Sequence, residues 1–271
     1  MNARILVGFS LLLCALSASS VQDQHAAARE EVNQGVKAYK AANYDEAIQH
    51  FENAVRLEPE LKIGRLYLAT AYAQQYVPGV ETSENLDLAT KAINQYNQVL
   101  RVDPLNVTSA KGIAYLHLQM KRFDEAKAAY RKAIDMDPND PEMYYSVGVV
   151  DWSMAYQEIM SEKSRNNLKQ EDSMIRLPAC KDLRAAQLAN IEDGIAMLAR
   201  AIELRKNYDD AMVYTNLLYR LRADLQCNDP ASYSADIKKA NDWADLAMAA
   251  RQAKAKQQES QQQKPGDTPP N

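Results

Sequence analysis

The residues of this chain whose types could support chemistry are its cysteines, its histidines and its adjacent acidic pairs. The three histidines, His25, His50 and His117, show no metal-ligand spacing with one another or with the cysteines. A zinc site at Cys180 and Cys227 would need two further ligands that the sequence does not offer. The sequence also lacks a Gly-rich phosphate loop, a nucleophile elbow and a His-Glu zinc motif. We therefore predict no catalytic residue, no cofactor and no metal.

Two acidic pairs, Asp45-Glu46 and Asp124-Glu125, have the composition of acid–base groups. Each pair lies at the expected start of a helix, where negative charge complements the helix dipole. We interpret both pairs as helix-start residues. His117 falls on a core-side helix position, which indicates a packing role.

The first twenty residues differ from the rest of the chain. A basic start precedes a short apolar stretch, residues 5–16, and small residues follow it. This order is typical of a secretory signal peptide, residues 1–20, and the apolar stretch is short for a membrane span. We expect cleavage after Ser17 or Ser19, with an uncleaved signal anchor as the alternative.

Removal of the signal peptide would leave Cys180 and Cys227 as the remaining cysteines. An even number in an exported chain favours a disulfide, with two independent buried thiols as the alternative. Closing a loop of roughly 47 residues would contribute on the order of 4 kcal/mol. A lipid anchor at Cys14 is the one membrane attachment considered, although Leu13 fits poorly before a lipidated cysteine.

One spacing of residues recurs three times along the chain. Each copy has Ala, an aromatic residue, two apolar residues and Pro at offsets of 4, 3, 3 and 2. The copies are Ala47-Phe51-Ala54-Leu57-Pro59, Ala92-Tyr96-Val99-Val102-Pro104 and Ala126-Tyr130-Ala133-Met136-Pro138. The last two prolines are 34 residues apart, which is the period of a two-helix repeat.

This pattern resembles the tetratricopeptide repeat family, which places small residues, an aromatic residue and Pro at fixed positions of a helix pair. The first repeat matches at Gly35, Ala47, Phe51, Ala54 and Pro59. It departs at Glu31, Gln34 and Ala38, where the family has larger apolar or aromatic residues. The resemblance implies an all-α fold, a right-handed α-α superhelix of about five helix pairs whose concave face is lined by the first helices.

We predict that the repeats occupy residues 21–251 and that the tail, 252–271, is disordered because it lacks apolar residues. The five repeats are predicted at residues 28–61, 62–106, 107–140, 141–208 and 209–251. The fourth repeat carries an insertion, 157–190, that we interpret as a helical hairpin extending beyond the array. Cys180 and Cys227 both lie between the helices of neighbouring repeats, which places them on one side of the stack.

Helical periodicity selects the side chains of the concave face, at positions 2, 5, 9 and 12 of each first helix. The predicted partner groove comprises Ile63, Leu66, Thr70, Lys111, Tyr115, Leu118, Tyr145, Val149, Trp152, Val213, Leu217 and Arg220. Its apolar and aromatic middle suits capture of a peptide or helix. Alternatively, Tyr115, Tyr145 and Trp152 pack against the inserted segment or a final helix.

The net charge of −4 is mild, and acidic and basic residues are interspersed along the chain. The sequence therefore has no basic block of the kind that binds nucleic acid. The resemblance implies a protein partner. We predict an exported, non-enzymatic scaffold or adaptor of the bacterial cell envelope, which is either periplasmic or associated with the envelope. The alternatives are a lipid-anchored subunit of an outer-membrane assembly or secretion machine, and an enzyme with its site in residues 157–190.

Overall fold

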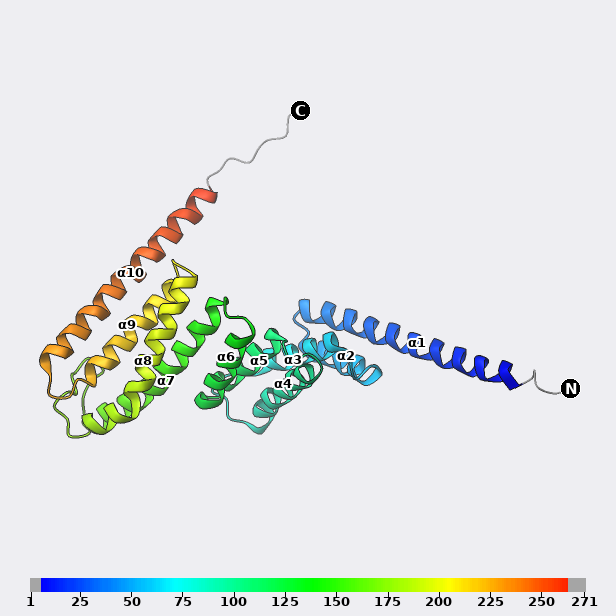
Figure 1. Cartoon of the computed structure of the whole chain (residues 1–271), viewed down its shortest axis with the longest axis horizontal. Coiled ribbons are helices and arrows are strands. Elements are labelled where there is room, and N and C mark those ends of the chain that lie inside the picture. The colour runs from blue at the N-terminus through cyan, green and yellow to red at the C-terminus, as the bar shows by residue number, and fades with distance from the viewer. Residues whose placement is uncertain (1–5, 263–271) are drawn as a thin grey trace, which may run out of the picture. The chain divides into compact units, whose positions relative to one another are not determined.

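The computed structural model describes residues 6–262, with side chains for residues 22–259. This part of the chain contains ten α-helices and no strand (Figure 1). The all-α prediction is therefore confirmed. The chain divides into two compact units between Lys121 and Arg122, at the turn inside the third predicted repeat.

The first unit contains five helices. They are α1 (Leu6–Lys40), α2 (Tyr44–Leu57), α3 (Lys62–Gln75), α4 (Ser83–Val102) and α5 (Val107–Gln119). Each helix from α1 to α4 packs against the next one along the chain. The pair α1–α2 shows why small residues recur: Phe51 is fully buried, and a Cβ added at Gly35 would lie 2.5 Å from its ring. Glycine thus lets the two helices close over a large aromatic side chain.

The long connection between α3 and α4 is organised by one buried amide. The side chain of Asn85 accepts from the backbone N–H of Val77 at 2.8 Å and donates to the carbonyl oxygens of Val77 and Val80. Thr82 begins α4 by accepting from the Asn85 backbone N–H at 3.3 Å. Polar side chains thereby satisfy a loop that would otherwise leave backbone groups unpaired.

The second unit also contains five helices. Its members are α6 (Phe123–Met136), α7 (Pro141–Arg165), α8 (Cys180–Leu204), α9 (Asp209–Asp224) and α10 (Pro230–Gln262). Figure 1 shows α7 to α10 as long helices lying side by side, and each contacts its successor. The predicted insertion lengthens α7 and α8 to 25 residues each, so the helical hairpin is confirmed.

This hairpin does not project alone, contrary to our expectation that it extends beyond the array. Ile159, Met174 and Ile191 are fully buried in one apolar cluster that also contains Leu218 and Leu225, at the end of α9. The end of α9 therefore covers the hairpin.

The predicted disordered tail differs from the structure over part of its length. Helix α10 continues to Gln262, and residues 252–259 are exposed on it. Ala, Lys, Gln and Glu in this segment have high helix propensity, so the helix extends beyond its packed part. Residues 263–271 lie outside the described residues.

The N-terminal predictions remain predictions. Residues 1–5 of the predicted signal peptide lie outside the described residues, as does the side chain of Cys14, and α1 begins at Leu6. No helix within the described part of the chain has the length and hydropathy needed to cross a membrane.

Candidate protein-binding surface

In the first unit, α1 and α3 border a hollow of about 540 Å³. It is lined by Arg29, Val32, Asn33, Val36, Ile63 and Tyr67. Ile63 is 42% exposed, and Tyr67 stacks on the ring of Phe51 with centroids 5.4 Å apart. A rigid apolar wall next to a guanidinium and an amide can hold an extended peptide by side-chain burial and by hydrogen bonds.

The other predicted groove residues of this unit differ in exposure. Leu66 lines a second hollow, while Thr70 donates its hydroxyl to the Leu66 carbonyl oxygen at 2.8 Å. On α5, Tyr115 is half exposed, and Lys111 and Leu118 are half-buried. Tyr115 is therefore the predicted aromatic side chain with the most surface open to a partner.

In the second unit, aromatic rings form a row along α7 and α9. Tyr145 lies 5.1 Å from Tyr208 and 5.6 Å from Tyr214, as centroid distances. Trp152 lies 5.3 Å from Tyr214, edge to face, and stacks on Tyr156 at 4.8 Å. Tyr145 thus packs on Tyr208 and Tyr214, and Trp152 packs on Tyr214 and on Tyr156, which precedes the insertion. The row remains partly exposed.

The phenols of this aromatic row stay neutral. Burial raises the pKa of Tyr145, Tyr208 and Tyr214 above the ordinary value for tyrosine. Tyr208 also donates to the Glu142 carboxylate at 2.5 Å, and Arg205 donates to the same carboxylate at 2.6 Å. The row therefore ends in a polar cluster at the start of α7.

The predicted groove residues on α9 differ in their surroundings, because some of them contact α10. Val213 packs with Met212, Trp243 and other residues against α10. Arg220 donates to Asn241 of α10 at 2.9 Å. Leu217, like Val149 on α7, is half-buried. The structure thus turns part of the predicted groove toward the last helix of the chain.

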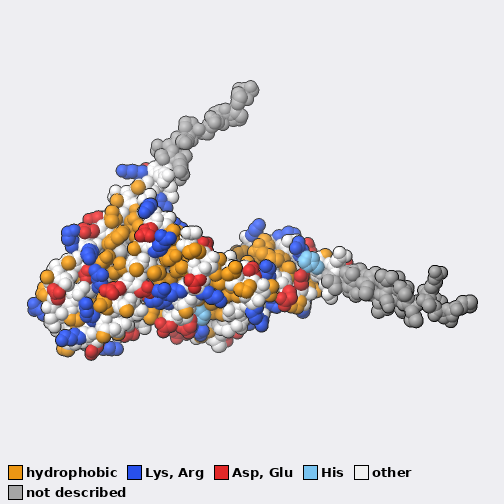
Figure 2. Space-filling model, viewed as in Figure 1, with side chains coloured by type: hydrophobic (Ala, Val, Ile, Leu, Met, Phe, Trp, Pro, Cys, Tyr) orange, Lys and Arg blue, Asp and Glu red, His pale blue; other side chains and the backbone are white. Residues whose placement is uncertain are grey.

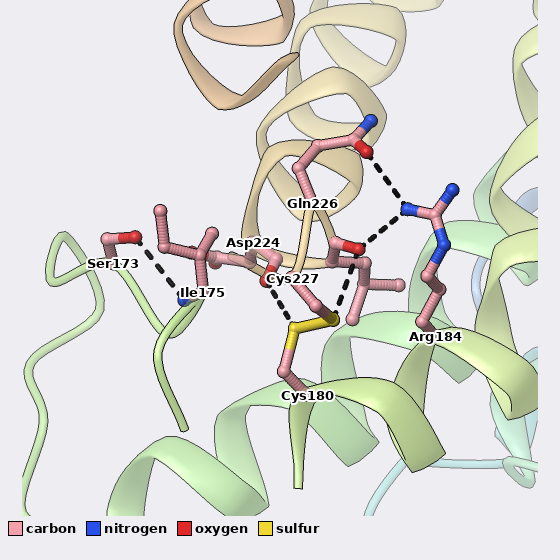
Figure 3. The surroundings of a disulfide bond; sticks show 8 residues. Ser173, Ile175, Cys180, Arg184, Asp224, Gln226 and Cys227 are labelled. Carbon is pink, nitrogen blue, oxygen red and sulfur yellow. Dashed lines mark hydrogen bonds between the residues drawn. A yellow bond between two sulfur atoms is a disulfide. The ribbon is translucent and has the colours of Figure 1, made fainter. Parts of the chain in front are cut away.

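A disulfide links Cys180, at the start of α8, to Cys227, just after α9 (Figure 3). Arg184 lies beside it and donates to the Leu225 carbonyl oxygen at 2.7 Å and to the Gln226 side chain at 2.9 Å. The loop of the α7–α8 hairpin is therefore fastened to the α9–α10 turn, which supports the disulfide prediction.

Next to the disulfide is a buried ion pair that the sequence analysis missed. Lys163 on α7 and Asp224 on α9 are nearly inaccessible, and their Nζ and Oδ2 atoms lie 2.6 Å apart. Lys163 also donates to the carbonyl oxygen of Gln170 at 2.8 Å. Burial raises the pKa of Asp224, and Lys163 opposes that effect. Lys and Asp are most often solvent-exposed on helices, so the sequence alone does not indicate that Lys163 and Asp224 are buried.

A second ionic cluster joins α6, α7 and α8. Lys127 contacts Asp151 at 2.5 Å and Asp193 at 2.8 Å, and Arg131 pairs with Asp193 at 2.6 Å. Asp151 is fully buried, and burial raises its pKa to about 7 against the opposing effect of Lys127. The same cations hold the pKa of Asp193 below its ordinary value despite its burial.

The histidines lie apart from these clusters. His25 and His50 pair with Glu58 and Glu31 at 2.6 and 2.7 Å, which joins α1 to α2, and His117 is half-buried on α5. Within the described residues, no group of three or more His, Cys, Asp or Glu side chains is placed to hold a metal ion. On the face drawn in Figure 2, basic and acidic side chains are intermixed with hydrophobic ones.

Helix pairs that pack in chain order define an α-helical solenoid. A model of the tetratricopeptide repeat family matches residues 32–76 and 87–145. These two segments therefore carry tetratricopeptide repeats. Comparison with curated proteins gives no match.

Solved structures support the same fold. A crystal structure of MamA protein aligns with 14% identity and a TM-score of 0.58, over 85% of this chain and 94% of that one. MamA 41-end from Desulfovibrio magneticus RS-1 aligns with 14% identity and a TM-score of 0.57, over 84% and 96%. YrrB, a TPR protein with an unusual peptide-binding site, aligns with 12% identity and a TM-score of 0.50, over 82% and 90%. The family and the fold support a scaffold for protein–protein interactions.

Proposed function

We propose that this chain is a non-enzymatic adaptor that binds a protein segment on the face formed by its first helices. The observation that carries this proposal is the hollow between α1 and α3, where Ile63 and Tyr67 remain accessible although both are large apolar side chains. A peptide that buries its own apolar residue there would remove this surface from water. The peptide-binding site named for YrrB agrees with such a role.

Photocrosslinking tests the binding face. A photoreactive amino acid placed at Ile63 or at Tyr115 would capture the same partner, because both positions lie on first helices. A matched position is Leu246, which is 51% exposed on α10 and lies off the predicted groove. Equal yields of the same adduct from all three positions would contradict binding on this face.

We also propose that the protein is exported to the bacterial cell envelope. The layout of residues 1–20 supports this proposal. Intact-mass measurement of the protein from the periplasmic fraction should give a chain that begins after Ser17 or Ser19. Recovery of the full chain in the cytoplasm would contradict export, and a lipid-modified Cys14 would favour the anchored alternative.

A further inference from the structure

A second hollow of about 420 Å³ lies in the first unit at the turns between helix pairs. Its apolar lining is made by Leu61, Ile63, Leu66 and Val99. The turn from α2 to α3 and the turn from α4 to α5 form its borders. This hollow shares Ile63 with the hollow of the first-helix face, but it opens at the turn edge of the helix pairs.

Carboxylates dominate the border of this turn-edge hollow. Glu58, Glu60 and Asp103 line it together with a single cation, Lys62, whose Nζ lies 3.4 Å from Asp103. Hydrogen bonds from Asn106 and Lys62 hold the pKa of Asp103 below its ordinary value, so this carboxylate is ionised at neutral pH. Glu58 lies 2.6 Å from His25.

A second cation, Arg65, also acts on this border. It donates to the Pro59 carbonyl oxygen at 2.6 Å and to the Gln95 side chain at 2.8 Å, and its guanidinium interacts electrostatically with Glu60. With Lys62 and Arg65 both counted, the three carboxylates still outnumber these cations, and the remaining negative charge can attract a cation from outside the chain.

The turn from α4 to α5 also exposes apolar side chains without a local structural reason. Leu105 is 74% exposed and Val102 is 49% exposed. Leu105 follows Pro104 at the turn position where the other repeats place Glu60 and Asn139. A polar residue is the ordinary choice at such a position, so an exposed leucine beside an apolar hollow marks a contact surface.

We propose that the turn-edge hollow docks a partner segment in which an apolar side chain is flanked by Lys or Arg. The apolar side chain enters between Leu61, Leu66 and Val99. The flanking cations approach Glu58, Glu60 and Asp103, and Leu105 covers the segment from the side. This site adjoins the first-helix face of the proposed function and shares Ile63 with it, but its charged border belongs to the turns.

Fluorescence anisotropy with two labelled peptides tests the charge preference. The probes are Lys-Lys-Leu-Phe-Lys-Lys and Glu-Glu-Leu-Phe-Glu-Glu, titrated with the full chain. We expect the Lys-flanked peptide to bind at least about tenfold more tightly, and its affinity to fall as salt is added. Equal affinities, or no saturable binding of the Lys-flanked peptide at about 1 mM protein, would overturn the proposal.

Variants of the border should shift this affinity in opposite directions. Glu60→Lys should weaken binding of the Lys-flanked peptide about tenfold, whereas Lys62→Gln should tighten it about threefold. Both side chains are exposed, so the fold should not change. The matched control is Glu125→Lys, an exposed change of the same charge on α6, which should leave the affinity unchanged.

Amide chemical-shift mapping locates the bound peptide. Shifts should concentrate at Leu61, Val99 and Asp103, which line the turn-edge hollow alone. Shifts that concentrate at Tyr115 and Leu118 would place the peptide on the first-helix face and would overturn the turn-edge site while leaving the proposed function intact. If Glu125→Lys weakens binding as much as Glu60→Lys does, the affinity depends on the net charge of the chain and not on this border, which would overturn the proposal.

Discussion

The two units share one kind of helix packing, and the second adds buried charges and a disulfide to it. Glycine meets a large apolar side chain in both units, as Gly35 meets Phe51 in the first and Gly148 meets Leu198 in the second. The helices that follow α1 in the first unit have 13 to 20 residues. In the second unit, α7 and α8 have 25 residues each, and buried charges and a disulfide fasten them. Stability should therefore depend on side-chain volume in both units, and in the second unit also on protonation and redox state.

The largest expected effect tests the volume dependence. Phe51→Ala should lower the free energy of unfolding by about 3–5 kcal/mol, because the ring is fully buried beside Gly35. Urea denaturation measures the loss. Tyr115→Ala is the matched control, and it should cost less than about 0.5 kcal/mol because Tyr115 is half exposed. Similar costs for the two variants would contradict the volume dependence.

Breaking the buried ion pair tests the charge dependence of the second unit. Asp224→Ala should cost about 3–5 kcal/mol, because it leaves the Lys163 ammonium buried without a carboxylate. The double variant Lys163→Met/Asp224→Leu removes both charges and should recover most of that loss in the same denaturation experiment. A double variant as unstable as Asp224→Ala would show that packing rather than charge explains the effect.

Removing the disulfide should have a somewhat smaller effect. Cys180→Ser/Cys227→Ser should lower the stability of the second unit by about 2–4 kcal/mol, since the crosslink restricts the unfolded chain. A reductant should destabilise the wild type to a similar extent and leave the double variant unchanged. Two reactive sulfhydryls per chain, assayed under denaturing, non-reducing conditions, would mean that the bond is absent from the protein.

The pH dependence sharpens the comparison further. The pKa of Asp151 is about 7 in the folded state, above its ordinary value of 3.8, so the native state retains a proton that the unfolded chain has released. The free energy of unfolding should therefore fall as pH rises from about 4 to about 7, with a contribution approaching about 1.4 kcal/mol per pH unit. Asp151→Asn should flatten this slope in the second unit. An unchanged slope would exclude Asp151 as its source.

The smallest expected effect is a gain at a turn of the first unit. Ala42 has a φ of 61°, a left-handed conformation that glycine adopts without steric cost. Ala42→Gly should raise the free energy of unfolding by about 0.5–1 kcal/mol. Ala41→Gly, at the neighbouring position, should not, because Ala41 is not in the left-handed region. Equal gains from both changes would refute the backbone explanation.

Much of the fold follows from local patterns in the sequence. Ala47, Phe51 and Ala54 recur at a helical spacing, and all three are fully buried. The disulfide was predictable because Cys180 and Cys227 flank helices that a stacked array places on one side. Such features depend on one helix pair and its neighbour, which periodicity describes.

The polar interior and the binding surface were less predictable. Lys163 and Asp224 are 61 residues apart, and their pairing depends on how far α7 and α9 extend past the ordinary repeat length. Tyr67 and Tyr214 were missed because the concave stripe was drawn at other positions, although both stand sixth in a first helix and could have been noticed. That the twelve predicted groove residues bind a partner remains a prediction.

The disulfide has a consequence for the response of the chain to pulling force. It closes a segment of 47 residues between the α7–α8 loop and the end of α9. While the bond is intact, stretching the two termini cannot extend that segment, which removes about 160 Å from the fully drawn-out length of the molecule. The oxidised protein would thus act as a shorter mechanical tether than the reduced protein.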